Sequence, residues 1–129
     1  MRKMLAALGI FLTLCTGVLT TVHAQAHRYS PAELDEMKQL AIAGISQAQA
    51  ALGVVYLDGN GLPQNYNRAH YWLEQASDQK NSVAQVQLGF MHLQGLGVTA
   101  NKTNARQWFA KACENNLEEG CLLYQRYAQ

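Results

Sequence analysis

Two cysteines near the C-terminus are the residues best suited to chemistry, because their spacing is compatible with three different roles. Cys113 and Cys121 lie eight positions apart in "CENNLEEGC", and the only other cysteine is Cys15. In a straight helix their Cα atoms would be about 12 Å apart, beyond the roughly 7 Å limit for a disulfide. The Asn and Gly residues between them favour a chain reversal, which would bring the two thiols together. A disulfide, a metal site and a redox centre all have to be weighed.

The N-terminus indicates the compartment in which these thiols would react. Two basic residues precede the apolar run "MLAALGIFLTLCTGVL", and the small residues of "TTVHAQA" follow it. This pattern is typical of a secretory signal, so we expect residues 1–24 to be a cleaved signal peptide. Cleavage after Ala24 or after Ala26 fits equally well, and an uncleaved anchor is the rival interpretation. We expect a periplasmic or secreted protein whose first residues, 25–29, are flexible.

An oxidising compartment favours the disulfide among the three roles. There, Cys113 and Cys121 are expected to pair, which would contribute about 2 to 3 kcal/mol to the free energy of unfolding. A metal site is disfavoured because two thiols lack the further Cys or His ligands that zinc needs, and redox catalysis is disfavoured because the spacing is not Cys-x-x-Cys. We predict no bound metal, no cofactor and no free thiol in the mature protein.

The remaining candidates for catalysis lack partners in the sequence. His70 and His92 have no evident nucleophile beside them, so packing or surface roles are favoured. Ser77 and Lys80 spell the S-x-x-K motif of serine β-lactamases, but the companion motifs S-D-N and K-T-G are absent. We therefore expect no catalytic residue and no enzymatic activity.

Charge and hydropathy exclude two classes of partner. Ten Lys and Arg oppose nine Asp and Glu, for a net charge of +1, and loss of Arg2 and Lys3 with the signal would reverse that to −1. Such a balance argues against binding to nucleic acid or anionic lipid. No second long apolar stretch follows the signal, so we expect no membrane contact after cleavage.

An internal repeat organises the rest of the chain. A shift of 36 positions aligns residues 48–76 with 84–112. A fixed period of this length is the signature of stacked supersecondary units. We predict repeats at about 48–83 and 84–119, with half repeats at both ends of a domain spanning 30–129. The paired residues that we expect to be structural are Leu52 and Leu88, Gly53 and Gly89, Gly59 and Gly95, Gly61 and Gly97, Ala69 and Ala105, and Trp72 and Trp108.

Each repeat has the pattern of two helices joined by a sharp turn. Apolar residues recur at spacings of three and four on both sides of "DGNG" and "QGLG". The glycines in those turns can adopt the left-handed conformation that a reversal requires, and Asn65 and Asn101 are suitable N-caps for the second helices. The predicted fold is all-α, a solenoid of α/α hairpins.

The combined motif resembles a known family. "A-x-x-x-L-G-x-x-Y-x-x-G-x-G" followed by "A-x-x-W-x-x-x-A" is similar to the Sel-one-like repeat (SLR), a relative of the tetratricopeptide repeat; His92 stands where Tyr is usual. The resemblance implies an interaction scaffold or adaptor. Together with the signal sequence, it leads us to expect a protein partner in the cell envelope. The segment from "KAC" to "GC" is also similar to the Helicobacter cysteine-rich proteins. That similarity implies an alternative function, the binding or hydrolysis of β-lactams or peptidoglycan fragments.

One face of the first helices is the candidate binding surface. In related solenoids the first helices line the concave side, so residues opposite the core face would meet a partner. The rival interpretation is that these side chains contact only neighbouring helices. The apolar C-terminal "LLYQRY" favours docking against a partner or a second copy, as a homo-oligomer. The residues that we expect to bind a partner are Val54, Asp58, Val86, Phe90 and Gln94.

Overall fold

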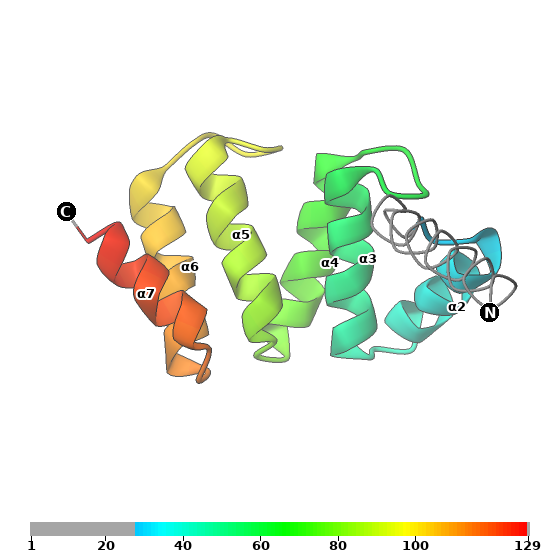
Figure 1. The fold of residues 1–129 in the computed structure, drawn as a ribbon, viewed down its shortest axis with the longest axis horizontal. Coiled ribbons are helices and arrows are strands. Elements are labelled where there is room, and N and C mark those ends of the chain that lie inside the picture. The colour runs from blue at the N-terminus through cyan, green and yellow to red at the C-terminus, as the bar shows by residue number, and fades with distance from the viewer. Residues whose placement is uncertain (1–27, 129) are drawn as a thin grey trace, which may run out of the picture.

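The computed structural model describes residues 28–128, which form a row of six α-helices and no strand (Figure 1). The expected signal peptide and Cys15 lie outside the described residues. Helices α2 and α7 lie at opposite ends of the row, and each helix packs on the next one along the chain. This is the predicted α/α solenoid, with hairpins α3/α4 and α5/α6 flanked by single helices. The helices are α2 (Pro31–Ile42), α3 (Ser46–Asp58), α4 (Tyr66–Asp78), α5 (Ser82–Gln94), α6 (Lys102–Glu114) and α7 (Glu118–Arg126).

The helix ends follow the predicted capping residues. The side chains of Asn65 and Asn101 accept hydrogen bonds from backbone N–H groups at the start of α4 and α6, both at 3.0 Å. Helices α3 and α5 end at Gly59 and Gly95, whose φ angles of 69° and 73° are left-handed. Helices α3 and α5 begin at residues 46 and 82, slightly ahead of the repeat starts expected at 48 and 84. Each structural repeat therefore begins two residues before the start that the self-alignment predicted.

Two glycines allow the helices of each hairpin to approach closely. A Cβ atom on Gly53 would lie 2.6 Å from Leu73 Cγ, and one on Gly89 would overlap the ring of Phe109. Leu73 and Phe109 are fully buried, whereas the neighbouring Trp72 and Trp108 are only partly buried at the edge of the core. The large residue that fills each hairpin is thus the one after the tryptophan. Close packing thus occurs at Gly53 and Gly89, whereas the tryptophans, which were also expected to be structural, lie at the edge of the core.

Buried amides tie each first helix to the end of its own second helix. Gln49 is 6% exposed; its Nε2 donates to the Ala41 carbonyl at 3.1 Å, and its Oε1 accepts from Gln79 Nε2 at 2.9 Å. In the next repeat Gln85 Oε1 accepts from Asn115 Nδ2 at 3.0 Å. These hydrogen bonds satisfy polar groups that would otherwise be costly to bury.

The last helix is held by a covalent link instead. A disulfide joins Cys113 at the end of α6 to Cys121 in α7, and their Cα atoms are 4.5 Å apart. The chain reversal that brings them together includes Asn116, a non-glycine residue with a φ of 65°. Asparagine tolerates this left-handed conformation better than most residues. The pairing fits the sequence-based expectation for the two thiols.

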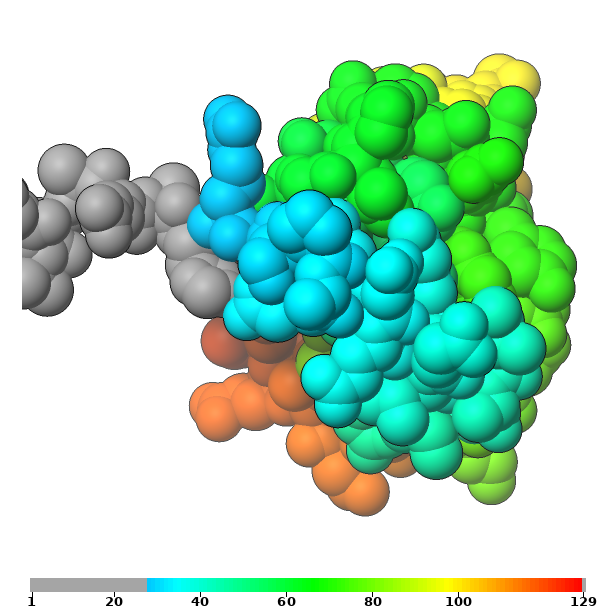
Figure 2. Space-filling view, turned by 90° about the vertical axis from the view of Figure 1, so that its right-hand side faces the viewer, coloured from blue at the N-terminus to red at the C-terminus, as the bar shows by residue number. Residues whose placement is uncertain are grey.

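The N-terminal end of the solenoid is covered by α2 (Figure 2). Around its C-terminus Leu40, Ile42 and Ile45 keep 44%, 70% and 46% of their surface exposed. Tyr29, which falls in the segment expected to be flexible, is half-buried beside Gly61. Between residues 28 and 128 no helix has the length and apolar character needed to cross a bilayer.

Candidate functional site

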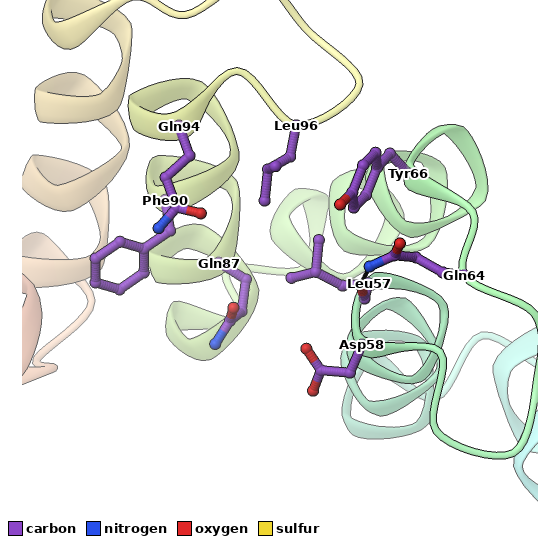
Figure 3. Close-up of a pocket in the computed structure, with 8 residues that line it drawn as sticks. All are labelled: Leu57, Asp58, Gln64, Tyr66, Gln87, Phe90, Gln94 and Leu96. Atoms are coloured by element: carbon purple, nitrogen blue, oxygen red, sulfur yellow. Dashed lines mark hydrogen bonds between the residues drawn. The ribbon is translucent and has the colours of Figure 1, made fainter.

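A groove lies between the two repeats, and we call it the central groove. It encloses about 570 Å³. Figure 3 shows side chains from α5 and the loop after it facing side chains from α3 and the start of α4. Because the groove is bounded by both repeats, it exists only when the hairpins are stacked. The residues that line it are Leu57, Asp58, Gln64, Tyr66, Gln87, Phe90, Gln94 and Leu96.

The lining combines apolar surface with amides that are free to bind. Gln64 Nε2 donates to the Leu57 carbonyl at 2.8 Å, which fixes this side chain and leaves its oxygen available. Gln87 and Gln94 make no side-chain hydrogen bond to any residue from 28 to 128. Amide side chains both donate and accept, so they match the N–H and C=O groups of a peptide backbone. The groove therefore has the chemistry of a peptide-binding surface.

Two aromatic residues, Phe90 and Tyr66, line the groove. The Phe90 ring is partly exposed and packs edge-on against the buried Phe109, with ring centres 5.3 Å apart. This contact holds Phe90 in place on the α6 side of α5, whereas Tyr66 lies on the opposite wall of the groove (Figure 3). A rigid, partly exposed aromatic ring can bury apolar surface of a ligand with little loss of side-chain entropy.

The structure brings together only part of the predicted binding surface. Asp58, Phe90 and Gln94 all line the central groove. Val86 does not: it is 4% exposed and packs in the core with Ala105 and Phe109. The prediction for Val86 is wrong because α5 is turned so that this position faces α6. Val54 lies in a separate, mostly apolar hollow along α3 that Tyr29 and Val83 also line.

The sequence did not indicate the other lining residues. Leu57 belongs to the apolar repeat pattern and reads as core, although it is only partly buried. Gln64, Tyr66 and Leu96 lie in or beside the inter-helix loops, where no periodicity predicts a direction. Only Gln87 carried a usable signal: it is polar where the first repeat has Ala51, and a polar residue in place of an apolar one indicates a position on the surface.

A second cluster of polar side chains lies where α4, α5 and α6 meet. The His70 and His92 rings are 5.9 Å apart, and His92 stacks on Trp108 at 6.4 Å. Burial lowers the pKa of His92 below its usual value, the neighbouring His70 lowers it further, and Glu74 acts in the opposite direction. His70 Nδ1 is 3.4 Å from Glu74 Oε2. The arrangement is an interhelix contact, as expected for packing histidines.

The remaining candidates for chemistry stay apart. Lys80 is exposed, with a φ of 61°, at the corner after α4, and neither it nor Ser77 lines the central groove. Such a lysine is not desolvated, so it lacks the environment that activates a catalytic amine. Within residues 28–128 no three His, Cys, Asp or Glu side chains are grouped so that they could hold a metal ion.

Comparison with known proteins agrees with this architecture. The Sel1 repeat model matches residues 46–81 and 82–117. No curated protein sequence matches the chain. A Sel1 repeat protein from Oxalobacter formigenes is similar at 27% identity and a TM-score of 0.65, over 69% of this chain and 36% of that one. The protein c5321, a protective antigen of uropathogenic Escherichia coli with an SLR fold, is similar at 32% identity and a TM-score of 0.65, over 69% of this chain and 19% of its own.

A third structure shares the fold over more of its length. Helicobacter pylori cysteine-rich protein B is 19% identical, with a TM-score of 0.67, over 79% of this chain and 77% of that one. The first two structures are much longer, since the matched region spans 36% and 19% of their chains. The common element is the stack of helix hairpins.

Proposed function

Because this chain belongs to the Sel1 repeat family, whose members generally mediate protein–protein interaction, we propose that it binds a partner protein through the central groove. The observation that carries the proposal is the groove itself, where a partly exposed Phe90 lies beside the unpartnered amides of Gln87 and Gln94. A segment of a partner would bury the ring and hydrogen-bond to the amides. The groove needs no moving part and no catalytic group for this role.

The partner is a protein of the cell envelope, and the chain acts there as a non-enzymatic adaptor in the periplasm or outside the cell. The basic and apolar N-terminal sequence supports export. The Cys113–Cys121 disulfide supports an oxidising compartment, since structural disulfides are rare in the cytosol. Fractionation of cells expressing the full chain tests this location. Recovery of the protein in the cytoplasm, with residues 1–24 intact, would contradict it.

Site-specific photocrosslinking tests the interaction. A photoreactive residue replacing Gln94 in the groove should capture a partner, and one replacing Gln39, exposed on α2, should not. The decisive control is Phe90→Asp in the Gln94 crosslinking variant. If the groove is the binding surface, this change abolishes the crosslink while the circular dichroism spectrum stays helical. Equal capture from both positions, or capture that survives Phe90→Asp, would rule out the groove.

A further inference from the structure

We propose that the central groove selects a peptide segment carrying a lysine or arginine, and that Asp58 pairs with the basic group. This inference rests on the proposed function, because it specifies the partner segment that the groove accepts. It follows from the charge of the lining residues, from the position of Asp58 on its helix and from the difference between the two repeats.

The charge of the groove has one sign. Asp58 is the only charged residue among those that line it, and no lysine or arginine is among them. Asp58 is exposed and makes no ion pair with another residue of the part that the structure describes. An approaching cation would meet an uncompensated carboxylate, whereas an acidic segment would be repelled.

The position of Asp58 increases the negative potential there. It is the last residue of α3, and no basic residue lies in the last turn of that helix. The C-terminal end of a helix carries partial negative charge, so an acidic residue is unfavourable for the helix at this position. Helix α5 also ends at the groove, at Gln94. Two helix C-termini and one carboxylate therefore act on the same space, and all of them favour a bound cation.

The second repeat provides an internal comparison. Gln94 stands at the position equivalent to Asp58, on the same turn of a helix that ends in the same kind of left-handed glycine. The fold thus accepts a neutral amide at this position and does not require an acid. The packing of the repeat therefore does not explain why Asp58 carries a carboxylate.

The rest of the groove fits the remainder of such a side chain. Leu57 and Leu96 offer apolar surface for the methylene stem of lysine or arginine, and the Gln64 oxygen is positioned to accept from its donors. Gln87 and Gln94 then remain for the backbone of the segment. The occupant is therefore a peptide in extended form, with one basic side chain directed toward the end of α3.

Selection from a random peptide library displayed on phage tests the inference with the purified protein. We expect the enriched peptides to share a Lys or Arg at one position, and to bind Asp58→Asn about two- to fivefold more weakly. The matched control is Asp78→Asn, which removes an exposed acid from the last residue of α4, away from the groove. This variant should bind the same peptides with unchanged affinity.

Charge reversal completes the test. A peptide whose basic residue is replaced by Glu should lose binding to the original protein and regain it with Asp58→Lys. Enriched peptides that lack a common basic residue, yet still require Phe90, would overturn this inference and leave the proposed function standing. Failure to enrich any peptide dependent on Phe90 would overturn both. Enrichment of acidic peptides would contradict the assigned charge preference directly.

Discussion

Replacing Gly89 with alanine should destabilise the protein, although alanine is the better helix former. The added Cβ would lie 2.7 Å from Phe109 Cδ1 and 3.0 Å from its Cζ, closer than carbon atoms approach without displacement. Phe109 cannot yield easily, because it is fully buried and its ring contacts those of Phe90 and Tyr127. Overpacking of a core costs about 1 to 3 kcal/mol. The gain in helix propensity offsets only about 0.5 to 1 kcal/mol.

The net effect is a loss of about 1 kcal/mol in the free energy of unfolding, which is the difference between the midpoints of those two terms. For a domain of this size, such a loss lowers the melting temperature by several degrees, at about 4 to 8 °C per kcal/mol. Thermal and urea unfolding followed by circular dichroism measure it directly.

The same substitution in a second variant, Phe109→Val, tests whether the contact with Phe109 causes the destabilisation. Phe109→Val removes the ring atoms that the new methyl group would meet. In that background Gly89→Ala should become stabilising, by up to about 1 kcal/mol, because only the propensity term remains. A change of sign between the two backgrounds is the expected result. Destabilisation of equal size in both would show that the glycine is needed for some reason other than the contact with Phe109.

Three further predictions follow from the contacts of the last repeats. Replacing Cys113 and Cys121 together with serine should lower the free energy of unfolding by about 2 to 3 kcal/mol, and alkylation of the original protein without reductant should yield no adduct at these thiols. Because the folded pKa of His92 is lowered below 6.5, the unfolded chain binds more protons, so stability should fall as pH drops through about 6.5. His92→Phe should flatten this slope in urea titrations. Gln85→Leu, which leaves the Asn115 amide without its partner, should cost about 1 to 2 kcal/mol in the same assay.

The sequence predicted the fold well because the same helix-capping and helix-ending residues occur in both repeats. Asn65 and Asn101 can each cap a helix, and Gly59 and Gly95 can each end one, so agreement between the repeats removed the ambiguity of a single pattern. The rotation of each helix about its own axis, which decides which side chain enters the core, could not be predicted from these repeated residues. Trp72 reads as a core residue by size, yet the close approach at Gly53 draws Leu73 into the hairpin and leaves the tryptophan at the edge.

The groove was predictable only where it lies on regular helices. Asp58 and Gln94 end equivalent helices, so the repeat identified both at once. Val86 was assigned to the surface by counting positions along α5, but the actual direction depends on where α6 packs, and that is a tertiary property. Gln64 could not have been found from sequence, since its place in the groove is set by a hydrogen bond to the Leu57 carbonyl across a turn.

The disulfide lies at a position of the repeat that links neighbouring helices. At the N-terminal end of each first helix one residue forms a link: Gln49 bonds to Gln79, and Gln85 bonds to Asn115, each at the end of the helix that follows. Cys121 occupies the equivalent place in α7. Gln49 also bonds backward, to the carbonyl of Ala41 at the end of the preceding helix, and Cys113 stands at the position of the repeat equivalent to Ala41. The disulfide from Cys121 to Cys113 therefore joins the same two positions of the repeat as the hydrogen bond from Gln49 to Ala41, and it replaces that hydrogen bond with a covalent link.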